Sequence, residues 1–283
     1  MPEKIVVVGA GVMGSGIAQV LVTGGYEVAL VDVADEVLEG ARTGIRARLA
    51  RLKEKGVIDE ESFSGAMGRL KISVDLLGEV RDALFVIEAV PEKLELKQDL
   101  FSSISREAPR DAVLASNTSE LSVTAIAGAT VCPDRVIGMH WFNPPPLMKL
   151  IEVVVGVDTS TETVDKTVAL SKAAGKEVVI VQDRQGFVTT RVLCAFLIEC
   201  YRVLEEGIAT RDDIDKAVRL AFNHPMGPFE LSDMIGLDTI LFASKGLAGA
   251  FGERFRAPQS LVKLVEAQRC GVKSGEGFYR YEK

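Results

Sequence analysis

The feature that most constrains the fold of this 283-residue chain is a glycine-rich turn near its start. Apolar residues 5–8 lead into Gly9-Ala10-Gly11-Val12-Met13-Gly14, and a helical pattern follows directly. In such a motif the first glycine permits a tight turn, the second lets the backbone approach a pyrophosphate, and the third lets helix and strand pack closely. The N–H groups at the start of the helix would then bind the phosphates. The arrangement predicts a dinucleotide site rather than a purely structural turn.

An acidic residue completes this motif. Asp32 ends the next apolar run, residues 27–32, at about the 20-residue spacing that the motif requires. Its carboxylate would accept hydrogen bonds from the hydroxyls of an adenosine ribose and would repel a 2′-phosphate. Val33 and Ala34 follow, so the next positions offer no arginine for that phosphate. We therefore expect NAD as the cofactor in preference to NADP.

Composition argues against several other classes of protein. A formal net charge of −7 argues against general affinity for nucleic acids, and no uninterrupted apolar stretch is long enough to span a membrane. The N-terminus has no basic segment followed by an apolar region and a cleavage site. The two histidines are far apart and the cysteines form no C-x-x-C pair, so we expect no metal site. A cytoplasmic enzyme with reduced thiols is expected; its cysteines are Cys132, Cys194, Cys200 and Cys270.

Strand and helix patterns alternate through the first two thirds of the chain. The expected strands cover residues 5–9, 27–32, 70–73, 84–88, 112–116, 136–140, 148–155 and 178–181. The expected helices between them cover residues 13–23, 35–55, 59–67, 94–104 and 164–174. Such alternation predicts an α/β fold, a Rossmann-type and mostly parallel sheet with helices on both faces. We assign it to residues 1–184, with a helical arm at about residues 35–68.

Only helical patterns follow residue 183. They cover residues 187–206, 211–221, 237–251 and 259–269. This pattern predicts an all-α C-terminal domain, residues 185–283, for substrate binding and dimerisation. Because its long helices carry more apolar positions than one small bundle can bury, we expect a homodimer formed through this domain.

One histidine and one acid form the leading catalytic candidate. His140 lies at the end of an expected strand, and open α/β sheets bind ligands at strand ends. Imidazole suits proton exchange with an alcohol near neutral pH. Glu152 is a lone acid among apolar residues of the next strand, where a carboxylate is costly unless it is paired. We expect the two to pair as in a catalytic triad; the alternatives are a satisfied core histidine and an edge-strand acid that faces water.

Other polar groups are ambiguous when taken alone. Ser116-Asn117-Thr118-Ser119 follows an expected strand, where such groups either hold a substrate oxygen or cap a helix. Glu92 and Lys97 would be surface charges beside Pro91 at the start of a helix. A basic flank on the helix at residues 35–55 would, from its charge pattern, be a solvated face; it contains Arg48, Arg51 and Lys55.

Taken together, the motifs resemble those of the 3-hydroxyacyl-CoA dehydrogenases, and among them the short bacterial 3-hydroxybutyryl-CoA dehydrogenases. The resemblance extends from Ile5 to Tyr281 and includes the glycine-rich turn. The other stretches that carry the resemblance are Glu88-Ala89-Val90-Pro91-Glu92, Ala115-Ser116-Asn117-Thr118-Ser119, His140-Trp141-Phe142-Asn143-Pro144, His224-Pro225-Met226-Gly227-Pro228 and Lys273-Ser274-Gly275-Glu276-Gly277-Phe278-Tyr279. Several of these stretches are not shared with other dinucleotide-binding dehydrogenases.

The resemblance implies a reaction and a set of residue roles. A (3S)-3-hydroxyacyl-CoA would be oxidised with NAD to a 3-oxoacyl-CoA, or the reverse, in fatty acid or butanoate metabolism. His140 would take the hydroxyl proton, Glu152 would orient it, and the helical arm would cover the CoA moiety. Ser119 and Asn143 would hold the substrate oxygen and the nicotinamide end. The implied cofactor contacts are Gly9, Gly11, Val12, Met13, Gly14, Asp32, Ala89, Glu92, Lys97, Asn117, Ser119, Asn143 and Lys273, and the implied substrate contacts are Ser119, Thr190, Arg48 and Lys55.

The chain departs from the family pattern at three positions. Thr190 replaces the usual asparagine that helps to hold substrate, and its side chain reaches less far. Many members have two phenylalanines after the histidine, and this chain has Trp141 at the first of these positions. Arg48 aligns with a CoA-contacting serine, and the accompanying lysine is retained as Lys55. Arg48 with Lys55 would suit the phosphates of CoA. Two alternatives follow: a dehydrogenase of a 3-hydroxy acid that is free or bound to acyl carrier protein, and a non-catalytic dinucleotide-binding structural protein.

Overall fold

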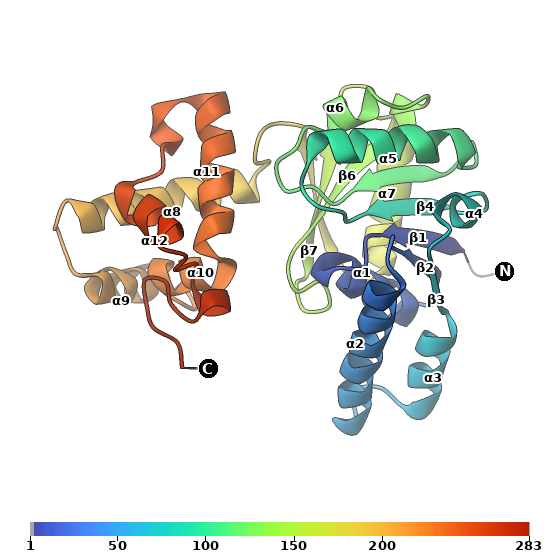
Figure 1. The fold of residues 1–283 in the computed structure, drawn as a ribbon, viewed down its shortest axis with the longest axis horizontal. Helices are drawn as coiled ribbons and strands as arrows, with labels where there is room; N and C mark the ends of the chain where they lie inside the picture. The colour runs from blue at the N-terminus through green and yellow to red at the C-terminus, as the bar shows by residue number, and fades with distance from the viewer. Residues whose placement is uncertain (1–2, 283) are drawn as a thin grey trace. The chain divides into compact units, whose positions relative to one another are not determined.

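The computed structural model describes residues 3–282, which form two compact units divided between Asp183 and Arg184 (Figure 1). The outer ends of the predicted domains, residues 1 and 283, lie outside the described residues. Each unit has its own buried apolar cluster. We therefore describe each unit by itself.

The N-terminal unit is built on one eight-stranded sheet with the order β3-β2-β1-β4-β5-β6-β7-β8. Adjacent strands are parallel except β6 and β7, which are antiparallel. The predicted Rossmann-type, mostly parallel sheet is thereby confirmed. The strands are β1 (Lys4–Val8), β2 (Glu27–Val31), β3 (Leu70–Ser73), β4 (Phe85–Glu88), β5 (Val113–Ser116), β6 (Val136–Trp141), β7 (Leu150–Val155) and β8 (Glu177–Gln182).

Seven helices accompany the sheet. They are α1 (Val12–Thr23), α2 (Asp35–Glu54), α3 (Glu60–Gly68), α4 (Leu76–Val80), α5 (Leu94–Glu107), α6 (Val123–Ala127) and α7 (Thr161–Ala173). One buried cluster joins α1, α2 and α7 to the sheet strands, because these helices carry apolar stripes of helical period. In Figure 1, α2 and α3 extend away from the sheet as a helical pair, where the arm was predicted. The pattern did not predict α4 and α6, which have five residues each and begin at the side-chain caps Asp75 and Ser122.

The glycine-rich turn has the geometry that its residues require. Gly9 has φ +97°, and a Cβ there would lie 2.7 Å from the carbonyl oxygen of Ala89. A Cβ at Gly14 would lie 1.7 Å from the carbonyl oxygen of Gly9, so only glycine lets α1 pack this close to β1. A Cβ at Gly11 would meet no atom within 4 Å. The first and third glycines are thus structural requirements, and the second borders open space.

The C-terminal unit is helical. Its helices are α8 (Thr189–Glu205), α9 (Arg211–Phe222), α10 (Pro228–Ile235), α11 (Leu237–Phe251) and α12 (Gln259–Glu266). The pattern placed only a chain break near α10, but Pro228 starts this helix and Glu230 accepts a hydrogen bond from Gly227 N. Within residues 3–282 no single helix has the length and apolar composition to cross a bilayer. The pair α10 and α11 meets that test only when both are counted together, and the two are bent by 96°.

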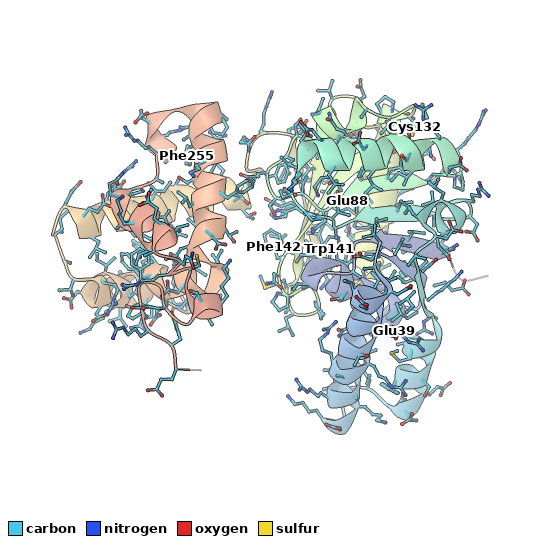
Figure 2. All side chains as sticks on the ribbon, viewed as in Figure 1. Glu39, Glu88, Cys132, Trp141, Phe142 and Phe255 are labelled. Carbon is cyan, nitrogen blue, oxygen red and sulfur yellow. The ribbon has the colours of Figure 1, made fainter. Side chains whose placement is uncertain are left out.

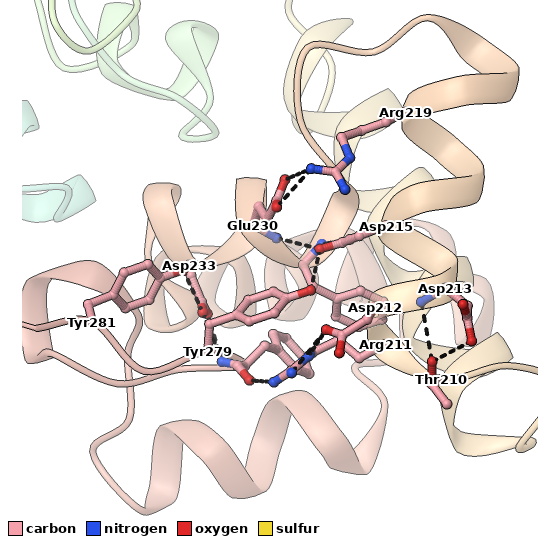
Figure 3. Close-up of polar contacts among 12 residues, drawn as sticks. Thr210, Arg211, Asp212, Asp213, Asp215, Arg219, Glu230, Asp233, Tyr279 and Tyr281 are labelled. Carbon is pink, nitrogen blue, oxygen red and sulfur yellow. Dashed lines mark hydrogen bonds and ion pairs between the residues drawn. The ribbon is translucent and has the colours of Figure 1, made fainter.

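Two buried carboxylates attach the C-terminal tail to the helices of this unit, as Figure 3 shows. Asp233 accepts hydrogen bonds from Phe278 N, Tyr279 N and the Tyr281 hydroxyl, at 2.8–3.0 Å. Asp215 accepts one from the Tyr279 hydroxyl at 2.7 Å. A Cβ at Gly277 would lie 2.1 Å from Asp233 Oδ1, so the tail needs glycine there. This packing is a physical reason for the motif that covers residues 273–279.

The packing at Gly14 yields a stability prediction. Gly14→Ala should lower the free energy of unfolding by about 2–3 kcal/mol, because the new methyl group forces α1 away from β1. Gly40→Ala is the matched control, because Gly40 lies within α2 and has open space around its Cα; it should hold or raise stability by about 0.5 kcal/mol. Urea unfolding followed by circular dichroism measures both. Equal midpoints for the two variants would contradict the packing argument.

Candidate active site

The leading catalytic pair lies across the antiparallel junction of the sheet. His140 on β6 and Glu152 on β7 are directly opposite each other in the strand register. His140 Nδ1 lies 2.7 Å from Glu152 Oε2, and both side chains are buried. Because a carboxylate only accepts, the proton between them belongs to Nδ1, and Nε2 is the ring nitrogen that would exchange protons with a substrate. Glu152 lies on an interior strand, so it is not an acid at a wet edge.

The dinucleotide motif forms a cradle at the start of α1. Ser15 N donates to Gly11 O, so the N–H groups of Val12, Met13 and Gly14 have no acceptor within the helix. These groups and the open space beside Gly11 suit a pyrophosphate. Asp32 Oδ2 accepts a hydrogen bond of 2.7 Å from Ala10 N, so this carboxylate also braces the turn. The donors and the space fit the phosphates of a dinucleotide.

A buried ionic cluster lies at the carboxyl ends of β4 and β5. Lys97 Nζ on α5 lies 2.6 Å from Glu88 Oε1 and 3.2 Å from Glu92 Oε2. Lys97 and Glu88 are fully buried, and Glu88 is labelled in Figure 2. Burial raises the pKa of Glu88, although Lys97 and Ser116 both donate to its carboxylate. The ammonium of Lys97 is therefore covered by its two acids, rather than displayed as the surface charge that local pattern suggested.

The same cluster holds the loop that follows β5. Glu92 Oε1 accepts hydrogen bonds from the Thr118 hydroxyl at 2.5 Å and from Ser119 N at 2.9 Å. Asn117 Oδ1 accepts a hydrogen bond of 2.9 Å from Trp141 N, one residue beyond His140. The loops after β5 and β6 are thereby joined at the edge of the sheet where His140 lies.

Two of the predicted catalytic side chains project from these loops. Ser119 and Asn143 are exposed, and within residues 3–282 neither side chain has a hydrogen-bond partner. Thr118 instead accepts a hydrogen bond from Leu121 N in a local turn, and Ser122 caps the following helix. The hydroxyl and amide of Ser119 and Asn143 thus remain available to hold a ligand oxygen.

A cavity of about 660 Å³ opens between α1, α2 and the loop after β6. Gly11 and Gly16 line its α1 side, residues 143–147 line another side, and Gly44, Arg48 and Arg51 lie on its α2 wall. Arg48 Nε donates to Gln19 Oε1, whereas one terminal nitrogen of its guanidinium is buried without a partner among the described residues. Burial lowers the pKa of Arg48. The basic flank predicted as a solvated face thus contributes two cations to a concave site.

Three other predicted site residues lie away from these groups or in the second unit. Lys55 is exposed at the end of α2 and does not line the cavity. Thr190 lies in the first turn of α8, and Lys273 in a short 3₁₀ turn, where its ammonium lies 2.7 Å from Asp238 Oδ2. Their roles stay predictions.

The structure also identifies groups that sequence reasoning missed. Glu88 belongs to the conspicuous stretch of residues 88–92, but no local pattern predicts its ion pair, and the only local feature beside Lys176 is the preceding Gly175. In the described part of the chain no group of three or more His, Cys, Asp or Glu side chains is placed to hold a metal ion.

Comparison with known families gives two matches that together cover nearly the whole chain. The family model described as "3-hydroxyacyl-CoA dehydrogenase, NAD binding domain" matches residues 4–184. The model described as "3-hydroxyacyl-CoA dehydrogenase, C-terminal domain" matches residues 186–281. The boundary between them agrees with the division of the structure into two units.

Individual proteins resemble the chain over its full length. A probable 3-hydroxybutyryl-CoA dehydrogenase of Bacillus subtilis is 43% identical over 281 residues, which cover 99% of this chain and 98% of that protein. The human mitochondrial hydroxyacyl-coenzyme A dehydrogenase is 39% identical, over 99% of this chain and 91% of that protein. The crystal structure of (S)-3-hydroxybutyryl-CoA dehydrogenase from Ralstonia eutropha is 37% identical, covers 100% of both chains and superposes with a TM-score of 0.96.

The ionic cluster yields a prediction for stability. Lys97→Met should lower the free energy of unfolding by about 3–5 kcal/mol, because two adjacent carboxylates lose their shared cation. Glu88→Gln in the same chain should restore part of the loss, because it removes one of those charges. Lys93→Met, at an exposed lysine just before α5, is the control. Urea unfolding gives the comparison, and equal losses in the single and double variants would exclude charge repulsion as the cause.

Proposed function

Because the chain belongs to the 3-hydroxyacyl-CoA dehydrogenase family, we propose that it oxidises short-chain (3S)-3-hydroxyacyl-CoA thioesters with NAD, or catalyses the reverse reduction. The observation that carries the proposal is the buried His140–Glu152 pair, at the sheet edge that also bears the loops of Ser119 and Asn143. The relatives that are named as 3-hydroxybutyryl-CoA dehydrogenases support a four-carbon acyl group.

The residues of the chain supply proton transfer and orientation. Glu152 fixes the tautomer in which His140 Nε2 accepts the proton of the substrate 3-hydroxyl, and it stabilises the imidazolium that results. Ser119 and Asn143 hold the substrate oxygen from the two neighbouring loops. In the reverse direction the imidazolium returns its proton to the oxygen of the 3-oxo group. Geometry and acid–base chemistry thus come from the N-terminal unit.

NAD fits the cradle at the start of α1. Its pyrophosphate would meet the N–H groups of Val12, Met13 and Gly14 beside the open space at Gly11. Asp32 would bind the adenosine ribose, and the exposed Val33 after it offers no charge to a 2′-phosphate, which favours NAD over NADP. When bound, NAD supplies the acceptor for the hydride from C3. We propose that Glu92 contacts the cofactor and that the buried Lys97 supports Glu92 through their ion pair.

Gly11 and Val12 line one end of the cavity and belong to the cofactor cradle, and the end beside Arg48 and Arg51 would take the CoA carrier. Arg48 and Arg51 provide positive charge at its wall, which suits phosphates, and the small residues of α1 and α2 leave room for a flexible chain. Thr190 stands in place of the family's asparagine, which motivates an alternative substrate: a hydroxyacyl group on acyl carrier protein or a free 3-hydroxy acid. Turnover with acetoacetyl-CoA, an acyl-carrier thioester and free 3-oxo acids distinguishes these substrates.

We further propose a homodimer and a cytoplasmic location. Large apolar side chains are exposed on the helices of the C-terminal unit, among them Leu220, Phe222 and Phe242, and a partner subunit would cover them. The four cysteines are all free thiols in the structure, which is compatible with a reducing compartment.

The central test compares the two histidines of the chain. With acetoacetyl-CoA and NADH, His140→Gln should lower kcat about 10³-fold, because the glutamine cannot exchange the proton. NADH affinity, measured by fluorescence titration, should stay nearly unchanged. His224→Gln, at an exposed ring in the C-terminal unit, is the control and should keep full activity.

Glu152→Gln belongs to the same experiment, because it keeps the size of the side chain and removes its charge. We expect a loss of kcat of about 10²-fold with a changed pH–rate profile. A mild effect of His140→Gln would remove this residue from the mechanism. An unchanged pH–rate profile in Glu152→Gln would contradict the pairing.

The carrier site gives a separate prediction. Arg48→Ala should raise KM for acetoacetyl-CoA about tenfold, because a partly buried phosphate partner is lost. It should leave KM unchanged for the corresponding thioester of pantetheine, which lacks the CoA phosphates. Arg42→Ala, at an exposed arginine one to two turns earlier on α2, is the control. Equal KM changes for the two thioesters would show that Arg48 does not contact a phosphate.

A further inference from the structure

The loop between β6 and β7 forms one wall of the cavity, and it has few backbone N–H groups that could donate hydrogen bonds to its own carbonyls. Residues 143–147 all line the cavity, and three of them, Pro144, Pro145 and Pro146, have no N–H group to donate. Leu147 N and Met148 N both donate to the carbonyl of Pro144. Pro145 is buried, so its carbonyl needs a donor that the neighbouring prolines cannot supply, whereas the exposed Met148 could also bind water.

Lys176 provides that donor. Its Nζ lies 2.7 Å from Pro145 O and 2.7 Å from Met148 O, so one ammonium binds the loop at two points. The side chain is buried, burial lowers its pKa, and within residues 3–282 no carboxylate forms an ion pair with it. A buried lysine that binds only carbonyl groups and an aromatic ring is costly, which indicates that the position of this loop matters.

The loop is fixed from its other side by α1. A Cβ at Gly16 would lie 2.7 Å from Pro145 Cδ, so the proline ring rests directly on the helix backbone. Lys176 Nζ also lies 5.7 Å from the centroid of the Trp141 ring, at the start of the same connection. Trp141 and the neighbouring Phe142 are labelled in Figure 2, and Trp141 N is bound to Asn117. Lys176 thus links the cavity wall to the residue that follows His140.

We propose that Lys176 is a positioning residue for the acyl-CoA site: it fixes the wall formed by residues 143–148 and so determines the affinity for the thioester without touching it. The inference rests on the proposed function, which places the acyl-CoA carrier in this cavity. A lysine with only a general structural role would affect acyl-CoA and cofactor affinity alike, whereas a positioning residue for this wall affects the thioester selectively.

The test compares Lys176→Met with Lys172→Met, at an exposed lysine near the end of α7. Lys176→Met should raise KM for acetoacetyl-CoA and its Kd by calorimetry about tenfold, because two charge-assisted hydrogen bonds to the wall are lost. KM for NADH and kcat should change by less than about twofold, which corresponds to a free-energy difference below about 0.4 kcal/mol. Lys176→Arg, whose guanidinium can bind two carbonyls, should restore most of the affinity.

Fluorescence gives a readout that does not depend on turnover. Trp141 is the single tryptophan of the chain and is 2% exposed. Its emission should change in Lys176→Met and stay as in the unmodified protein in Lys172→Met. If Lys176→Met does not fold, Lys176→Gln, which can donate to one carbonyl, should give an intermediate rise of about threefold in Kd.

Two results would overturn the inference. The first is an unchanged Kd for acetoacetyl-CoA in folded Lys176→Met or Lys176→Gln. The second is an equal or larger rise in KM for NADH, which would assign the wall to the cofactor or to stability in general. Failure of the proposed function is a different result: the unmodified protein would then neither oxidise NADH with acetoacetyl-CoA nor bind this thioester.

Discussion

The antiparallel pairing of β6 with β7 is the constraint on which the active site depends. The antiparallel register places His140, near the end of β6, directly opposite Glu152 on β7. A buried carboxylate is stable in such a place only with a hydrogen-bonding partner, so each residue accounts for the burial of the other. The alternative of an edge-strand acid that faces water is wrong, because β7 lies between β6 and β8. The match to a dehydrogenase family favours a catalytic role for the pair over that of a purely structural core histidine.

The rest of the site is held by charged side chains that are buried or partly buried. Lys97 neutralises Glu88 and Glu92, and Glu92 in turn holds the loop of Ser119. Lys176 performs a comparable task for the loop after β6 with carbonyl groups as its acceptors. Loops that carry reactive groups have few apolar contacts of their own, so hydrogen bonds from a rigid framework must position them.

The sequence predicted the sheet, the arm, the helical second unit and the family, because each depends on local periodicity or on a motif of fixed spacing. The short helices α4 and α6 were missed because five residues are too few to show a helical period. Arg48 was predicted as part of a solvated basic flank from the charge pattern, yet the structure places it at a cavity wall beside Gln19. A charge pattern shows which face of a helix is basic but not what that face meets.

The sequence by itself determined the cradle at Gly9, Gly11 and Gly14, because the conformation of a tight turn depends on the types of a few consecutive residues. It also singled out His140 and Glu152, the one as a scarce residue type and the other as an acid in an apolar run. Only the tertiary structure decided that these two meet at 2.7 Å and that Lys97 and Lys176 bind inward. Strand register and the direction of a long side chain depend on contacts between segments distant in the sequence, which no local pattern records.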